Sequence, residues 1–455
     1  MSKMPKYPTP QERLEEGELR RKQVSRQSHA EAGVRRRSPI ALLEASVRGR
    51  VPSLVALKYQ LMSASPFAFF RGAVPIMAYD LAAHPHTGII CQLCGDAHVR
   101  NLGAFAGVDG RLVFDINDFD ETTQGPFEWD LKRLATSLVL AGLAVGSKAS
   151  KREPAVLAFV EQYRRMIVMF SKMPVIEMAR YQVHRLQRIE PISKVLLKAE
   201  RATPLHTLES LTVPAGDSPD AKAASGARVF KENRPMLTRV TGVKAREVLG
   251  SLKEYSESLQ PERRHFLAQY QPIDVAFKVV GTGSVGLRDY VVYCEGNGPG
   301  DPLFLQIKEE ARSAYEPYLG AIGAKHQGRR VVEGQRAMQL QSDPFLGWTT
   351  IANRDYLVRQ LSDYKGSLNL NELKGQGLID YAIVCGELLA RGHSRSGDAC
   401  VIAGYIGNGN KFDEAILEFA EGYAEQTQKD WELLLKSKHG VKANKAEDGK
   451  EAKNK

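Results

Sequence analysis

The segment between residues 273 and 308 constrains the fold more than any other part of this chain. Three apolar, strand-like stretches lie at residues 273–280, 290–294 and 303–308. The glycine-rich stretch Gly281-Thr282-Gly283-Ser284-Val285-Gly286 separates the first two, and the turn Asn297-Gly298-Pro299-Gly300 separates the last two. This order predicts an antiparallel sheet and not a βαβ unit, in which a crossover helix joins parallel strands.

Two kinds of nucleotide site use a G-x-G-x-x-G pattern. In a dinucleotide-binding fold the last glycine opens a helix, whereas here the glycines join two strands. A glycine hairpin that covers the phosphates of ATP fits this context, because glycine permits a close approach of the backbone to a ligand. We therefore predict that Gly281, Gly283, Ser284 and Gly286 bind a nucleotide.

Lys308 ends the strand that follows the glycine hairpin. Kinases place a lysine there to bind the α and β phosphates, and we predict the same role for Lys308. A helix is expected at residues 330–339, and its Glu333 is the predicted ion-pair partner of Lys308. Glu310 is nearer in sequence and is the alternative partner.

A second polar group lies far upstream, in Gly95-Asp96-Ala97-His98-Val99-Arg100-Asn101. Asp96 and Asn101 have the D-x-x-x-x-N spacing of a kinase catalytic loop. Asp96 would accept the proton of a hydroxyl nucleophile, and Asn101 would bind a metal ion. His98 is expected to brace the loop through hydrogen bonds.

An acidic cluster follows this loop and contains Asp115, Asp118, Asp120 and Glu121. Carboxylates this close repel one another when they are buried without a cation. Bound Mg²⁺ or Mn²⁺ would relieve the repulsion. We predict Asp118 and Asp120 as ligands and Asp115 as a competing ligand. Arg71, in an aromatic run, would bind an anionic substrate, cap a helix or pair with this cluster.

Composition adds few limits. The chain has 455 residues, 43% of them hydrophobic, and can bury a sizeable core. Much of the net charge of +10 lies near the two ends, so a nucleic-acid partner is not expected. No apolar run approaches the roughly 20 residues that span a bilayer, and five cysteines do not suggest a disulfide framework. Cys91 and Cys94 are expected to lie in a buried strand. The protein is expected in the cytoplasm.

The chain divides into parts of different composition. We expect a basic disordered arm (1–38), the first part of a catalytic lobe (39–200), a linker and helical connection (201–265), a β-rich nucleotide-binding lobe (266–365), helices that complete the catalytic lobe (366–437) and a charged disordered tail (438–455). The nucleotide-binding parts therefore follow the catalytic loop, whereas in kinases they precede it. Either the β lobe is unrelated, or the chain is a circular permutation.

The segment Leu388-Leu389-Ala390-Arg391-Gly392-His393 favours permutation. It resembles the helix that ends in L-A-x-x-H before the catalytic strand of aminoglycoside and choline phosphotransferases. Here that helix lies near the C-terminus, and the loop it would precede lies about 300 residues upstream. Permutation is tolerated where termini lie at the surface.

Several motifs together resemble a bacterial family known only as a domain of unknown function. They are Ser65-Pro66-Phe67-Ala68-Phe69-Phe70-Arg71-Gly72, Gly95-Asp96-Ala97-His98, Asn117-Asp118-Phe119-Asp120-Glu121, Pro126-Phe127-Glu128-Trp129-Asp130-Leu131-Lys132-Arg133-Leu134 and Gly334-Gln335-Arg336. The resemblance covers about residues 40–435.

At a greater distance the motifs are similar to the aminoglycoside-phosphotransferase branch of the protein-kinase-like superfamily. The resemblance implies that Asp96 is the catalytic base, Asn101 a metal ligand, Asp118 the principal metal ligand and Asp130 the acid that opens the later helix. One departure is Cys94, where that branch has histidine.

The sequence thus predicts an α+β, protein-kinase-like two-lobe fold with permuted order. The expected activity is ATP- and Mg²⁺-dependent transfer of a phosphoryl group to a hydroxyl of a small molecule or protein; the acceptor and the oligomeric state are not defined. One alternative is a catalytically silent kinase-like module that binds nucleotide or a protein. Another is a metal-dependent hydrolase that uses His98 and the acidic cluster.

Overall fold

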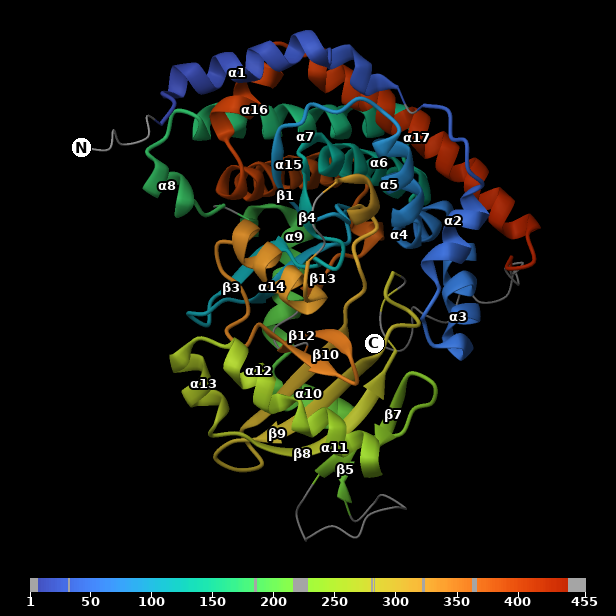
Figure 1. The fold of residues 1–455 in the computed structure, drawn as a ribbon, viewed down its shortest axis with the longest axis vertical. Helices are drawn as coiled ribbons and strands as arrows, with labels where there is room; N and C mark the ends of the chain where they lie inside the picture. The colour runs from blue at the N-terminus through green and yellow to red at the C-terminus, as the bar shows by residue number, and fades with distance from the viewer. Residues whose placement is uncertain are drawn as a thin grey trace.

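The computed structural model describes residues 7–31, 33–183, 186–215, 228–279, 281, 283–320, 324–361 and 366–440. The fold is α+β, with a helical part above a large sheet in Figure 1. Thr282, most of the segment 214–219 and most of the predicted tail lie outside the described residues. Within the described ranges, none of the helices combines the length and apolar character needed to cross a bilayer.

The helical part is built from both ends of the chain. The recurrence of apolar residues predicts helices at residues 129–143, 154–170 and 377–393, and the structure confirms them as α6, α7 and α15. The helices of this part are α1 (Pro10–Gln23), α2 (Pro39–Ser46), α3 (Pro52–Ser63), α4 (Pro66–Gly72), α5 (Val74–Ala82), α6 (Glu128–Ala144), α7 (Ala149–Phe170), α15 (Gln376–Ser396), α16 (Ala399–Ile406) and α17 (Lys411–Lys436).

Short antiparallel strands lie at the base of the helical part. The pairs are β1 (Ile90–Leu93) with β4 (Thr123–Pro126), and β2 (Leu102–Ala106) with β3 (Leu112–Ile116); β13 (Gly366–Ser367) joins the edge of β2. The sequence pattern predicts strands at residues 88–94 and 111–116 on either side of the Gly95–Asn101 loop, and the structure confirms these strands as β1 and β3. The strand that directly follows the loop is β2, which the pattern does not predict.

The large sheet has six strands in the order β11-β12-β10-β9-β8-β7, all antiparallel to their neighbours. They are β7 (Leu237–Val240), β8 (Gln271–Lys278), β9 (Asp289–Glu295), β10 (Pro302–Glu309), β11 (Gly347–Ile351) and β12 (Arg354–Gln360). The glycine stretch joins β8 to β9, so the antiparallel prediction is confirmed. Helix α14 (Gln327–Met338) connects β10 to β11.

The segment between the two parts contains more regular structure than the predicted linker. Its elements are α8 (Val175–Ala179), α9 (Glu190–Arg201), α10 (Pro204–Leu211), β5 (Thr212–Pro214), β6 (Arg228–Phe230), α11 (Gly242–Gly250), α12 (Leu252–Ser258) and α13 (Pro261–Leu267). Strand β7 also belongs to the large sheet. The β lobe therefore begins before residue 266.

The prediction of a disordered arm at residues 1–38 is wrong over α1. Thr9 and Glu12 form a reciprocal capping box at the start of this helix. Arg21, in the last turn of α1, and Arg26, beyond the helix, donate hydrogen bonds to the backbone oxygens of Tyr405 and Ile406, each at 2.8 Å. The basic side chains thus satisfy carbonyls that the end of α16 leaves without helical partners, and this contact orders the segment.

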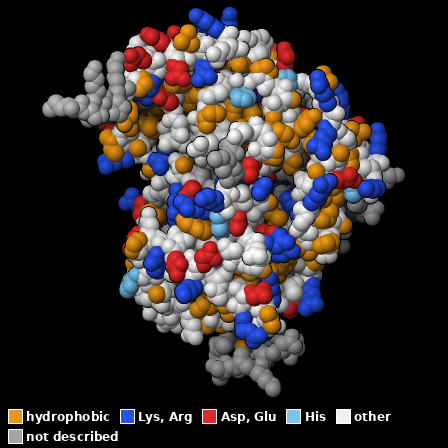
Figure 2. All heavy atoms as spheres, viewed as in Figure 1, with side chains coloured by type: hydrophobic (Ala, Val, Ile, Leu, Met, Phe, Trp, Pro, Cys, Tyr) orange, Lys and Arg blue, Asp and Glu red, His pale blue; other side chains and the backbone are white. Residues whose placement is uncertain are grey.

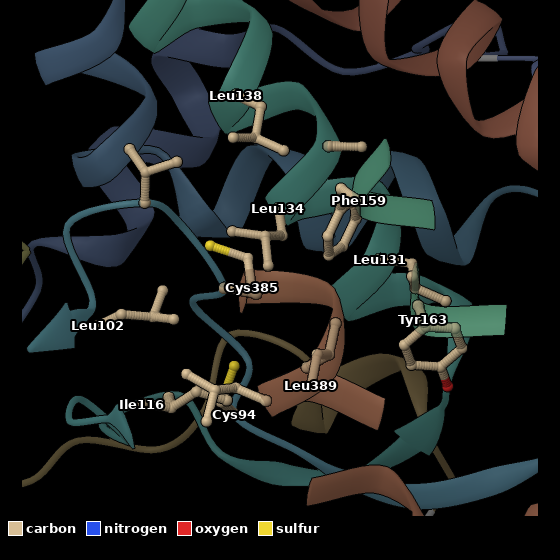
Figure 3. Packing of buried hydrophobic residues seen from close by; sticks show 14 of the residues in the cluster. Cys94, Leu102, Ile116, Leu131, Leu134, Leu138, Phe159, Tyr163, Cys385 and Leu389 are labelled. Carbon is tan, nitrogen blue, oxygen red and sulfur yellow. The ribbon is translucent and has the colours of Figure 1, made fainter. Parts of the chain in front are cut away.

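Helix α15 brings the C-terminal segment against the Gly95–Asn101 loop. Figure 3 shows Cys385 and Leu389 of this helix packed among Cys94, Ile116 and Leu134, all members of the largest buried cluster. At the end of α15, the Ser396 hydroxyl accepts a hydrogen bond of 3.1 Å from the backbone N–H of Gln92 in β1. Helix α15, which contains the Leu388–His393 segment, thus lies beside β1, the strand that leads into the Gly95–Asn101 loop.

Candidate functional site

The Gly95–Asn101 loop leaves β1 in a fixed conformation. Gly95 has φ of +82°, and a β-carbon there would lie 2.2 Å from the Glu121 carbonyl oxygen, so only glycine fits. The Asp130 carboxylate accepts hydrogen bonds from the N–H groups of Cys94 (2.8 Å) and Gly95 (3.0 Å). Asp130 therefore fastens α6 to the loop, and it lies in the supporting layer under the cleft.

Asp96 is held by a buried arginine that the sequence analysis did not single out. Arg133 of α6 donates to Asp96 Oδ1 from Nε at 2.8 Å and from Nη2 at 2.5 Å. Burial raises the pKa of Asp96 above its ordinary value, and Arg133 opposes that effect. Asp96 Oδ2 lies 3.7 Å from His98 Nε2. The Oδ2 atom is thus the oxygen left for a ligand.

His98 braces the loop, as predicted. Its Nδ1 accepts a 3.1 Å hydrogen bond from the Arg100 N–H. Burial, together with Arg71 and Arg133, holds the pKa of His98 well below its ordinary value, so the ring is neutral at pH 7. A neutral ring with Nδ1 engaged does not serve as a second cation in the site.

Asn101 turns its amide nitrogen toward the loop itself. Its Nδ2 donates a hydrogen bond of 2.8 Å to the Asp96 backbone carbonyl. The Asn101 Oδ1 atom is therefore the end of the amide that remains to bind a cation, and the residue lines the same cleft as Asp96. A neutral oxygen of this kind is an accepted ligand of hard cations.

Lys308 of the large sheet reaches the acidic cluster of the helical part. Its Nζ forms an ion pair with Asp120 and lies 2.5 Å from Oδ1. Burial raises the pKa of Asp118, but Lys308 and Arg359 more than offset this, and the net pKa is lowered. Burial and the neighbouring Asp118 raise the pKa of Asp120. Asp118 is therefore the carboxylate whose pKa is lowered beside Lys308, and Asp120 forms the direct ion pair.

The glycine hairpin is fastened to the helical part across the cleft. Its Gly283 carbonyl accepts hydrogen bonds from Lys58 Nζ (2.8 Å) and Arg50 Nη1 (3.0 Å). The Val285 carbonyl accepts a second bond from Arg50 (2.7 Å), and the Gly286 carbonyl accepts one from the Val51 N–H (2.7 Å). These contacts draw the hairpin down toward α3.

These segments meet in one charged cleft. Most of the residues predicted from the sequence line it: Arg71, Asp96, His98, Asn101, Asp118, Asp120, Gly281, Gly283 and Ser284. Gly286 and Lys308 lie at an adjoining depression. Figure 2 shows basic and acidic side chains interspersed across the middle of the face drawn there. The cleft encloses about 80 Å³, room for only a few water molecules.

Two residues predicted for the site lie elsewhere. Glu333 is more than half exposed on α14 and pairs with Arg329 at 2.7 Å, so its predicted pairing with Lys308 is wrong. Glu310 lines the cleft instead, and it is a charged neighbour of Lys308. Asp115 is paired with Arg391 of α15 at 2.5 Å, with both side chains buried. Asp115 therefore stabilises the packing of α15 and does not face the cleft.

The donor set suits magnesium only together with a bound anion. Within the ranges that the structure describes, no three His, Cys, Asp or Glu side chains converge on one point. Mg²⁺ commonly takes one or two carboxylates together with waters and substrate phosphates. Asp118 and Asn101 fit that pattern, whereas Asp120 is engaged by Lys308. Cys91 and Cys94 are free and buried.

Arg50, Lys58, Arg133 and Glu310 are the site residues that sequence reasoning missed or ranked low. Arg133 lies in the quoted motif around Trp129-Asp130, but its partner is 37 positions away. Lys58 occupies an apolar helix and Arg50 precedes it. A charged residue on the apolar face of a helix is the one sequence signal that identifies Lys58.

The fold and the cleft define an α+β protein with a charged site between a helical part and an antiparallel sheet. The chain belongs to a family described as an uncharacterized protein conserved in bacteria (DUF2252), which it matches over residues 50–437. No curated protein and no solved structure gives a significant match.

Proposed function

We propose that this protein is an ATP- and Mg²⁺-dependent phosphotransferase that acts on a hydroxyl group. One observation carries the proposal: Lys308 forms an ion pair with Asp120, although the two residues are 188 positions apart in the chain. A lysine on the strand after a glycine hairpin, next to a metal-binding aspartate, is the arrangement that phosphoryl transfer uses in kinases. A permuted kinase-like order accounts for these segments meeting across such a separation.

Each side chain has a stated role in this proposal. The glycine hairpin and Lys308 would bind the phosphates, and Asn101 and Asp118 would hold Mg²⁺, which neutralises phosphate charge when bound. Asp96 would orient the acceptor hydroxyl through Oδ2. The hydroxyl oxygen forms a bond to the γ-phosphorus, the bond from that phosphorus to the β–γ bridging oxygen breaks, ADP leaves, and the hydroxyl proton passes to Asp96.

The raised pKa of Asp96 fits a proton acceptor, because a carboxylate with a raised pKa is a stronger base. Arg133 keeps the carboxylate oriented through Oδ1. The small volume of the cleft requires the hairpin to rise from Lys58 and Arg50 before a triphosphate enters. Nucleotide binding in this proposal therefore includes movement of Gly283, whose carbonyl accepts the hydrogen bonds from Lys58 and Arg50.

The experiment is calorimetry with a non-hydrolysable ATP analogue, with and without Mg²⁺. Wild type is compared with Asp118→Ala and with Asp109→Ala, a control in the exposed turn between β2 and β3. The proposal predicts Mg²⁺-dependent binding in wild type and the control, and loss of the Mg²⁺ dependence in Asp118→Ala. Wild type without Mg²⁺-dependent affinity would contradict it.

A catalytically silent nucleotide-binding module is the second candidate. The observation in its favour is the ion pair of Arg133 with Asp96, which occupies one oxygen of the proposed base. Asp96→Asn separates the two candidates. Full cellular function of this variant favours the silent module, and loss of function with unchanged nucleotide affinity favours catalysis.

A further inference from the structure

The guanidinium of Arg71 lies in the cleft without a hydrogen-bond or ion-pair partner among the described residues. The residue lies near the end of α4 and its side chain lines the cleft beside Asp96 and His98. Its Nε is fully buried, and Arg71 has no hydrogen bond or ion pair among the described residues. Burial and the nearby Arg100 lower the pKa of Arg71 to about 10. An unpartnered buried charge is costly, so an anionic ligand would stabilise this guanidinium.

Two more cations face the same space. Lys58 is 2% exposed, and both Lys58 and Arg50 donate to the neutral Gly283 carbonyl. Burial and the nearby Arg50 lower the pKa of Lys58 well below its ordinary value. An anionic oxygen is a stronger acceptor for these groups than a carbonyl oxygen. A ligand anion would therefore replace the hairpin carbonyl when the hairpin rises.

Arg71 and Lys308 have different acidic neighbours in the cleft. Arg71 interacts with Asp96 and Asp118, whereas Lys308 interacts with Asp120, Asp118 and Glu310. Asp118 is thus a charged neighbour of both cations. Lys308 marks the nucleotide side of the cleft, and Arg71 lies with Asp96, the proposed base.

We propose that Arg71, Lys58 and Arg50 form a subsite for an anionic group on the acceptor, a phosphate or carboxylate. The inference rests on the proposed phosphotransferase function and narrows its acceptor to hydroxyl compounds that carry such a group. Arginine suits this role because its planar fork matches carboxylate and phosphate oxygens. Arg50 lies in the turn before α3, Lys58 in α3 and Arg71 in α4. All three precede the Gly95–Asn101 loop, whereas the groups proposed to bind ATP come from that loop, the acidic cluster and the sheet.

The test uses the full chain and inorganic phosphate as the probe, measured by calorimetry. Wild type, Arg71→Gln and Arg71→Lys are compared with Arg111→Gln, a control whose side chain is 87% exposed. Each is titrated without nucleotide and with a saturating non-hydrolysable ATP analogue and Mg²⁺. Thermal unfolding of each variant identifies any loss of folding.

The subsite predicts that phosphate binds wild type with the analogue present. Arg71→Gln should weaken phosphate binding roughly 10- to 100-fold, the loss expected for a charged hydrogen-bond donor, whereas Arg71→Lys retains part of it and Arg111→Gln all of it. No phosphate binding by wild type, or equal affinity in folded Arg71→Gln, overturns the subsite. If the analogue abolishes phosphate binding, Arg71, Lys58 and Arg50 belong to the nucleotide site, and their assignment to the acceptor is overturned. If the analogue does not bind but phosphate binds through Arg71, the phosphotransferase proposal fails and the anion subsite stands.

Discussion

Asp115 and Asp118 lie three positions apart, and we assign them different roles, Asp115 in packing and Asp118 in the proposed metal site. The two Asp115 carboxylate oxygens lie 2.5 Å from Nη2 of Arg391, and each side chain is 4% exposed. Asp115→Asn preserves the shape of the side chain but leaves the Arg391 charge uncompensated. Breaking a buried ion pair in this way costs about 3–5 kcal/mol. Arg395 is a further cation close to Arg391 and adds to the cost.

Asp118→Asn is the matched variant. Lys308 keeps its direct partner Asp120 in this variant, so the free energy of unfolding should fall less than in Asp115→Asn. The Mg²⁺-dependent affinity for an ATP analogue should be lost. In Asp115→Asn the melting temperature should fall by about 6–10 °C, taking roughly 2 °C per kcal/mol for a large chain, and the nucleotide affinity should persist.

Thermal unfolding and calorimetry on the same samples separate the two roles. The calorimetric titrations are carried out below the melting temperature of the less stable variant. Asp115→Asn that melts like wild type and loses Mg²⁺-dependent nucleotide binding would refute the assignment of Asp115 to packing. It would also restore Asp115 as a metal ligand.

Lys308→Met should weaken binding of an ATP analogue by about 10-fold or more because a charged phosphate contact is lost, whereas Glu333→Gln should leave the affinity unchanged. Fluorescence titration measures both affinities, and an equal loss in the two variants would contradict the assignment of Lys308 to the nucleotide site. Gly95→Ala should lower the free energy of unfolding by about 3 kcal/mol or more, because a β-carbon would lie 2.2 Å from the Glu121 carbonyl oxygen. Urea unfolding measures this loss, and an unchanged midpoint would contradict the loop conformation described for Gly95. Burial raises the pKa of Asp289 to about 7 from an unfolded value of about 3.9. The folded state thus holds more protons, and its stability should fall as the pH rises from about 4 to 7. Asp289→Asn should remove that decline in urea unfolding, and an identical pH profile would show that Asp289 does not titrate there.

Much of the β lobe could be predicted from local sequence. The strands on either side of the glycine stretch are apolar, and the turn at residues 297–300 contains glycine and proline, so order and direction follow from short-range rules. The position of Lys308 at the end of β10 can be predicted in the same way. Its ion-pair partner cannot, because α14 exposes Glu333 to solvent, and which face of a helix is buried depends on packing that the sequence does not show.

The ion pairs of the site depend on long-range packing. Asp115 and Arg391 are 276 positions apart, and Arg133 and Asp96 are 37 apart. Spacing rules identify groups on one loop or one helix face, and they do not pair a strand with a distant helix. The α1 helix is different, because Thr9 and Glu12 carry a local capping signal that the basic composition of the arm obscured.

A crystal structure of the protein with Mg²⁺ and a non-hydrolysable ATP analogue tests the central claim most directly. We expect the triphosphate to lie between Lys308 and Asp118 under the glycine hairpin, and Mg²⁺ to contact Asp118 and Asn101. We also expect that the Gly283 carbonyl no longer accepts a hydrogen bond from Lys58. A nucleotide bound away from this cleft, or Mg²⁺ held by other residues, would contradict the account.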